Sequence, residues 1–312
     1  MAVALKTVMD GPPAALTLSP RADFVESATV QELTERAVAY LDAGFPVHFR
    51  GPSGTGKTTL ALHVAAQVGR PVILISGDDE FTSSDLIGGQ SGYRYRKVVD
   101  RYIHSVLKYE EDAVQHWADQ KLTAACREGF TVVYDEFTRS RPEANNVLLT
   151  VLEERLLALP DMAQEQAYLK VHPEFRAIFT SNPQEYAGVH EAQDALSDRL
   201  VTIDLDYYER DTEIAITIAR SSLSPVQAVR IVDIVRDLRA SGEYDQIPTL
   251  RACIMIARVT AMQGLKASGR DPRFVRVCLD VLGPKTASTS QARERNNNQQ
   301  QMLVHLIEHY CK

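Results

Sequence analysis

Short apolar runs alternate with helical stretches over the first two thirds of the chain, and this alternation predicts a parallel sheet. Strands that are buried on both faces read as continuous apolar runs rather than as alternating patterns. The segments between them have the length and periodicity of helices, which cover both faces of such a sheet. The predicted strands are residues 47–50, 72–76, 131–134, 176–181 and 201–205.

Helical periodicity also fills the chain after Asp206, where no strand is predicted. The capping-box spacing at Thr29–Glu32 predicts a helix that Gly44 ends, and we expect further helices at 57–68, 142–159, 210–221, 225–240, 249–262 and 272–282. The fold class is therefore α/β followed by a small all-α domain. The predicted domain ranges are an irregular segment 1–28, an α/β domain 29–208, a helical domain 209–283, a polar low-complexity linker 284–301 and an amphipathic helix 302–312.

Composition narrows the class of protein without naming a function. The chain has 312 residues, of which 45% are hydrophobic, and a net charge of −7. An overall basic field for nucleic acid is absent, and no apolar run approaches the ~18 residues that span a membrane. The N-terminus does not resemble a signal peptide. The scattered cysteines predict buried apolar residues in a reducing cytoplasm: Cys126, Cys253, Cys278 and Cys311.

The most informative segment is Gly-Pro-Ser-Gly-Thr-Gly-Lys-Thr at 51–58, which fits the phosphate-binding loop G-x-x-x-x-G-K-[ST]. Glycines let main-chain amides approach phosphate oxygens, Lys57 reaches the β- and γ-phosphates, and the Thr58 hydroxyl binds Mg²⁺. A strand before the loop and a helix after it favour this interpretation over a chance glycine-rich turn. The predicted ATP-binding residues are Gly51, Pro52, Ser53, Gly54, Thr55, Gly56, Lys57, Thr58 and Thr59.

Acidic residues follow the strand predicted at 131–134. We predict that Asp135 holds Mg²⁺ and that Glu136 polarises the attacking water. An apolar strand that ends in Asp-Glu is by itself more often a solvated strand end, and the phosphate loop upstream reverses those odds.

Two later positions have a functional and a plain interpretation. Asn182 either orients the water or touches the γ-phosphate, or it forms an ordinary Asn-Pro turn. Arg199 either stabilises transferring phosphoryl charge in a neighbouring subunit or forms a local ion pair with Asp198 or Asp194.

With Arg251 in the segment 248–251, these residues follow the order of an AAA+ ATPase, which the chain resembles. The resemblance implies an ATP hydrolase with Mg²⁺, in which Asn182 is sensor 1, Arg251 is sensor 2 and Arg199 acts in trans. It also implies a homo-oligomer, a hexameric ring. The residues between Ser76 and Thr131 look like the helix-2 insert of the MoxR-type branch, and 160–175 resembles its hairpin insert.

Within that branch, residues 45–52, 125–130 and 134–146 are similar to the gas vesicle protein N family. That resemblance implies a cytoplasmic ATPase, compatible with a place at the gas vesicle surface, that acts on shell or accessory proteins. Two other functions stay open. One is a MoxR-type activator of a metabolic enzyme, such as a carboxylase or a metal-cofactor protein, and the other is a nucleotide-gated scaffold with incidental hydrolysis.

The segment 88–97, GGQSGYRYRK, lies inside the predicted insert and joins glycines to tyrosines and basic residues. We expect it either to face a ring's opening and grip a protein or to form a solvated pair of strands that packs subunits.

Overall fold

A computed structural model describes residues 15–19, 21–99, 109–159, 167–183, 194–242, 247–283 and 290–312, with the backbone alone for 89–99, 109–118 and 290–298. The chain divides into two compact units. Much of the predicted segment 1–28 and the predicted linker residues 284–289 lie outside the described part of the chain.

The first unit is built on a parallel sheet, which in the described residues has five strands in the order β2-β5-β8-β1-β9. Every neighbouring pair in this sheet is parallel, and β1 lies between β8 and β9. The predicted α/β class with a parallel sheet is therefore confirmed. The strands are β1 (Val47–Arg50), β2 (Val72–Ser76), β5 (Thr131–Asp135), β8 (Arg176–Ser181) and β9 (Val201–Asp204).

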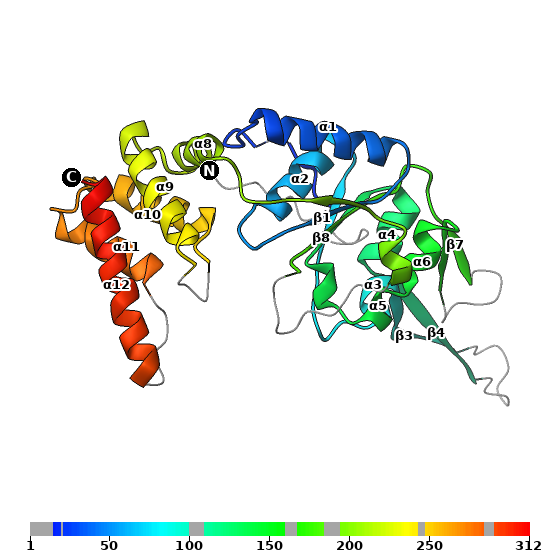
Figure 1. The fold of residues 1–312 in the computed structure, drawn as a ribbon. Coiled ribbons are helices and arrows are strands. Elements are labelled where there is room, and N and C mark those ends of the chain that lie inside the picture. Colours follow the sequence, from blue (N-terminus) through cyan, green and yellow to red (C-terminus); the bar gives the residue numbers. More distant parts are fainter. Residues whose placement is uncertain are drawn as a thin grey trace. The chain divides into compact units, whose positions relative to one another are not determined.

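Helices cover both faces of this sheet, as the continuous apolar runs predict. Alternate residues of β5 and β8, such as Tyr134 and Phe179, join a core with α3 (Ser83–Ile87), α4 (Lys121–Glu128) and α6 (Val147–Leu152). The residues between them, Val133 and Ile178, are fully buried too, so a second layer covers the other face. Figure 1 shows α2 (Lys57–Val68) on a different side of the sheet from α4 and α6. Helix α1 spans Ala28–Asp42 and begins before the predicted cap at Thr29.

The prediction of one helix over 142–159 is wrong. Two short helices, α5 (Pro142–Asn145) and α6, form instead, and the second of them ends at Leu152. The backbone at Arg155 is then left-handed, with φ of 56°. The chain then forms β6 (Leu156–Ala158), which pairs antiparallel with β7 (Tyr168–Lys170). In β6 only the central Leu157 is buried, which is the alternation of a strand, so pairing with β7 overrides helix propensity here.

The insert between β2 and β5 is a long hairpin between the short helices α3 and α4. Its strands β3 (Gly88–Val99) and β4 (Tyr109–Asp119) pair antiparallel, and Figure 1 shows the hairpin extending away from the sheet. The segment 88–97 is thus part of strand β3, whose pairing register shifts between Ser91 and Tyr93. Tyr93 lies opposite Gln115 and Tyr95 opposite Ala113.

The second unit contains residues 205–312 with 20–34 and 51–57. Its helices are α8 (Arg210–Ser221), α9 (Pro225–Ala240), α10 (Leu250–Met262), α11 (Pro272–Leu282) and α12 (Ser290–Tyr310). The sequence predicts that the α/β domain ends at residue 208, and in the structure the two units divide after Asp204. The four cysteines are all buried, as the sequence predicts, and no disulfide joins them in the described structure.

The prediction that residues up to 301 form a flexible linker is wrong for 290–301. Helix α12 begins at Ser290, twelve residues before the predicted start at Met302. Gln299, Leu303, Ile307 and Cys311 recur every four residues and are all buried, so the apolar stripe of the last helix continues back past Met302. Packing in the helical core therefore outweighs the low complexity of the Asn- and Gln-rich run. Among the described residues, no helix is long and apolar enough to cross a bilayer.

Candidate nucleotide-binding site

The phosphate loop connects β1 to α2, as the sequence predicts, and its backbone requires glycine at two positions. Gly54 and Gly56 have φ of 78° and 82°, in the left-handed region that side chains disfavour. The Lys57 side chain is buried, and its ammonium donates hydrogen bonds to the carbonyl oxygens of Gly51 at 2.9 Å and Pro52 at 2.8 Å. The loop therefore holds a positive charge at the N-terminus of α2, where an anion is favoured.

Residues of the helical region lie against this loop within the second unit. A Cβ atom on Gly51 would stand 2.2 Å from the carbonyl oxygen of Leu205, and one on Gly54 would stand 2.4 Å from the Thr249 side chain. The Tyr208 hydroxyl comes within 3.7 Å of the corresponding position on Gly56. Sequence reasoning missed Tyr208 and Thr249. Arg251, the predicted sensor 2, is an exposed residue in the first turn of α10.

Asp135 ends β5 and meets the first turn of α2. The Thr58 hydroxyl donates to Asp135 Oδ1 at 2.6 Å, so the two predicted magnesium ligands are brought together. A hydroxyl and a carboxylate oxygen are the hard donors that Mg²⁺ prefers, and the pair fits this ion. Thr58 and Asp135 would hold it, and the ion would neutralise charge on the phosphates.

Glu136 lies directly after β5 in a strained backbone conformation, with φ of 52°. Its N–H donates to the Thr180 hydroxyl at 2.9 Å, and its carboxylate accepts a hydrogen bond from Arg139 Nη1 at 3.0 Å. Gly77, after β2, leaves the space for this turn, because a Cβ there would lie 2.0 Å from the Glu136 carbonyl oxygen. The ion pair with Arg139 is about half exposed and therefore weak. No signal within the Asp-Glu motif itself pointed to Thr180 or Gly77.

The other two predicted residues occupy different places in the first unit. Asn182 follows β8 immediately and is buried. Arg199 is near the start of β9, and its Nε donates to the Glu153 carboxylate at 2.8 Å, with further contacts to Glu153 and to the carbonyl oxygen of Ala195. The ion pair that the plain interpretation expects therefore exists, but with Glu153 rather than with Asp198 or Asp194.

A buried histidine lies on β1, three residues before the loop. His48 bonds through its ring nitrogens with Ser181 Oγ at 2.8 Å and Thr202 Oγ1 at 3.1 Å, which ties β1 to β8 and β9. Burial, helped by the charge of Arg50, lowers the pKa of His48 to about 4. The ring is therefore neutral at physiological pH and acts as a connector of strands.

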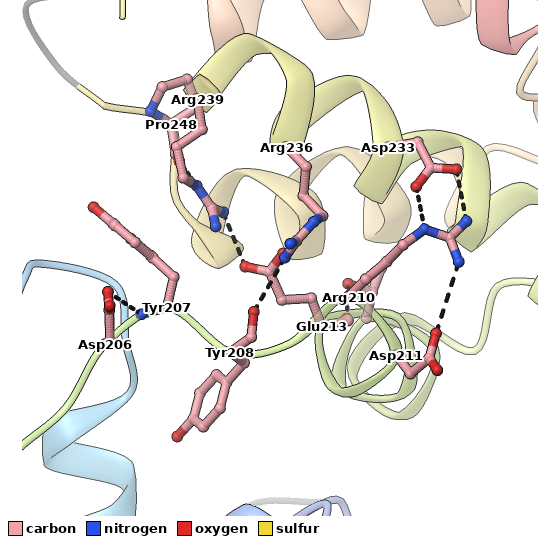
Figure 2. A network of polar contacts seen from close by, with 11 residues as sticks. Asp206, Tyr207, Tyr208, Arg210, Asp211, Glu213, Asp233, Arg236, Arg239 and Pro248 are labelled. Carbon is pink, nitrogen blue, oxygen red and sulfur yellow. Dashed lines mark hydrogen bonds and ion pairs between the residues drawn. The ribbon is translucent and has the colours of Figure 1, made fainter. Parts of the chain in front are cut away.

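A buried carboxylate organises the residues that flank the loop in the second unit (Figure 2). Glu213 on α8 is 1% exposed and accepts hydrogen bonds from Arg236 and Arg239, each at 2.9 Å. Arg236 also donates to the Tyr208 carbonyl oxygen, and Arg239 donates to that of Pro248. The Arg239 guanidinium stacks on Tyr207 at 4.3 Å. This network fixes both segments, 207–208 and 248–249, that lie beside the glycines of the loop.

Comparison with known proteins agrees with this geometry. Residues 46–200 match the model of the AAA domain, dynein-related subfamily. The chain is 60% identical to the gas vesicle ATPase GvpN of Ancylobacter aquaticus over 96% of its own length and 84% of that protein. It is 44% identical to the gas vesicle ATPase GvpN of Haloferax mediterranei over 87% and 77% of the two chains.

More distant proteins resemble the chain in part. Protein NorQ of Paracoccus denitrificans is 28% identical over 69% of this chain and 73% of that protein. The crystal structure of NtrX from Brucella abortus matches with a TM-score of 0.50 at 14% identity, covering 92% of this chain and 64% of the other, and supports the fold alone. The identity to the GvpN proteins over nearly the whole chain is decisive: the chain belongs to the gas vesicle ATPase GvpN family of AAA+ ATPases.

Proposed function

We propose that the chain hydrolyses ATP with Mg²⁺, assembles into a ring and assists gas vesicle assembly and growth by remodelling shell or accessory proteins. The observation that carries this proposal is the convergence of Thr58 and Asp135 at 2.6 Å beside the Lys57 loop, in a member of the GvpN family. Motif and geometry agree on the nucleotide chemistry, while the link to gas vesicles rests on the relatives.

Each residue has a distinct role in the proposed reaction. Lys57 balances the charge of the phosphates, and Thr58 with Asp135 holds the ion. Glu136 takes the proton of the attacking water, and Asn182, which follows the adjacent strand β8, orients that water. Arg251 senses the nucleotide from α10.

Ring formation is proposed for Arg199. The family arrangement supplies an arginine to the γ-phosphate of the neighbouring subunit, where it stabilises the transition-state charge. In the single chain Arg199 is held by Glu153, and both side chains are partly exposed, with 27% and 54% of their surface accessible. Such a pair is weak enough to exchange for a phosphate partner.

The β3–β4 hairpin is the proposed contact with the protein substrate. It extends from the α/β unit and carries Tyr93 and Tyr95, residue types that are enriched at protein interfaces. The relatives favour shell or accessory proteins of the gas vesicle as the partner.

The test is ATP turnover by the purified chain with and without gas vesicle shell proteins. Lys57→Ala should abolish ATP binding, because it removes the phosphate counter-charge, whereas Glu136→Gln should bind ATP without hydrolysing it. Shell proteins should stimulate the wild type. Equal loss of ATP binding in both variants contradicts the separate roles. Stimulation by an unrelated metabolic enzyme instead supports the activator function, and binding without turnover supports the scaffold.

A further inference from the structure

One buried hydroxyl outside the recognised motifs contacts both acidic residues of the site. Thr180 is on β8 and is fully buried, and its Oγ1 lies 2.5 Å from Asp135 Oδ1 and 2.9 Å from the backbone nitrogen of Glu136. The parallel pairing of β5 with β8 brings the ends of the two strands together, although these residues are 45 positions apart in the sequence.

The chemistry of the groups fixes the direction of both hydrogen bonds. The backbone N–H of Glu136 is only a donor, so the Thr180 hydroxyl accepts from it. The single hydroxyl proton is then available for the other partner, the ionised carboxylate of Asp135, which only accepts. Because the oxygen accepts one hydrogen bond while it donates another, each bond strengthens the other in this buried setting.

The two bonds act on groups whose orientation matters for hydrolysis. Asp135 Oδ1 receives hydrogen bonds from Thr58 and Thr180 at once, which fixes the plane of the carboxylate. Glu136 has a left-handed backbone that a non-glycine residue adopts at a cost, and such conformations persist only where the surroundings hold them. The bond from its N–H to Thr180 is one such restraint.

We propose that Thr180 is a positioning residue of the ATPase site, which sets the Asp135 carboxylate for the magnesium ion and the Glu136 turn for activation of water. This inference rests on the proposed Mg²⁺-dependent hydrolysis. Groups that orient a metal ligand from behind typically contribute 10- to 100-fold in metal affinity or activity, and we expect this range here.

The chain offers a matched set of variants. Thr180→Val keeps the shape and the branching that suits a strand but removes the hydroxyl. Thr180→Ser restores the hydroxyl. Thr131→Val is the control, because Thr131 is equally buried on the adjacent strand β5 and its hydroxyl has no hydrogen-bond partner in the part of the chain that the structure describes.

Two measurements test the role. In steady-state turnover, Thr180→Val should lower kcat about 10- to 100-fold, whereas Thr180→Ser and Thr131→Val should remain within about threefold of the wild type. In equilibrium binding of a non-hydrolysable ATP analogue, Thr180→Val should reduce the gain in affinity that Mg²⁺ gives over EDTA. Affinity in EDTA should be unchanged, because the phosphate loop is untouched.

The outcomes separate this inference from the proposed function. A wild type without Mg²⁺-dependent turnover overturns the proposed function itself. A normal wild type with Thr180→Val at wild-type kcat and magnesium dependence overturns the positioning role, as does a serine variant that is as slow as the valine variant. Thermal melting checks that each variant folds. If Thr180→Val does not fold, Thr180→Ala and Thr180→Ser, which differ only in the hydroxyl, decide the question in the same two assays.

Discussion

Replacing Glu213 with glutamine tests how the helical unit holds the segments beside the phosphate loop. The substitution keeps the shape of the side chain and removes its charge. Two charge-assisted hydrogen bonds, to Arg236 and Arg239, are weakened, and each such bond contributes about 1.5–3 kcal/mol. The Arg236 side chain is 35% exposed, so water can replace its lost partner, and the smaller value applies to its bond. The Arg239 side chain is only 12% exposed, so water does not compensate there and the larger value applies. With about 1.5 kcal/mol for the Arg236 bond and up to about 3 kcal/mol for the Arg239 bond, we expect a total loss of about 4 kcal/mol, within the range for breaking a buried ion pair.

A second carboxylate in the same unit provides the control. Asp233 accepts two hydrogen bonds from Arg210, at 2.6 and 2.8 Å, so its local geometry is at least as good (Figure 2). The Arg210 side chain is 46% exposed, however, and water screens exposed ion pairs. Asp233→Asn should therefore lose clearly less stability than Glu213→Gln.

Urea unfolding followed by helical circular dichroism measures both variants, and hydrogen exchange assigns the loss to α8–α10. A Glu213→Gln loss no larger than that of Asp233→Asn refutes the reasoning from burial. Because Arg236 and Arg239 also hold the carbonyl oxygens of Tyr208 and Pro248, Glu213→Gln should weaken ATP binding as well, and Asp233→Asn should not.

Two further predictions concern subunit exchange and pH. Arg199→Ala should bind ATP but hydrolyse it about 10³–10⁵-fold more slowly. Mixing it with Lys57→Ala subunits should partly restore phosphate release, because an intact Lys57 site then receives Arg199 from its neighbour. Mixed oligomers that show no recovery at any ratio count against a trans arginine. The folded state keeps His48 neutral down to a pKa of about 4, whereas the unfolded chain takes up the proton near 6.5, so stability falls as pH drops through this window. Between pH 7.5 and 5, His48 lowers the free energy of unfolding by about 2 kcal/mol. Urea unfolding at the two pH values should show that the pH-dependent loss of stability in His48→Gln is smaller by this amount.

Local patterns were sufficient to locate most elements of this fold. The apolar runs at Val72–Ser76 and Arg176–Ser181 are strands at the predicted positions, and the helices at Arg210–Ser221 and Pro225–Ala240 have the predicted bounds. In each case the information lies in consecutive residues, because hydrophobic periodicity and proline at the first turn act within a few positions.

Predictions failed where distant packing decides the structure. Residues 156–158 have no strong strand signal of their own and become β6 because β7 pairs with them. Residues 290–301 resemble a disordered tract in composition, yet Gln299 is buried and the helix that contains it continues into the core. Composition describes how an isolated segment behaves in water. Both of these segments are ordered by packing against other parts of the chain, which composition does not describe.

The candidate site shows the same division at the level of single atoms. A motif search finds Asp135 and Glu136 because they are adjacent to each other, and Lys57 and Thr58 because a loop requires a fixed spacing. It does not find Thr180, because what joins this residue to Asp135 is the order of strands, and strands that are neighbours in a parallel sheet are separated by long connections. The Asp135 carboxylate and the Glu136 backbone nitrogen are both hydrogen-bonded to Thr180 on β8, whereas the identity of the two acids is readable at the end of β5. A threonine in a buried strand is unremarkable in sequence, and its hydroxyl acquires a partner only when β8 lies beside β5. Residues that position catalytic groups should therefore be sought on the strand next in space to the motif, at the level where both strands end.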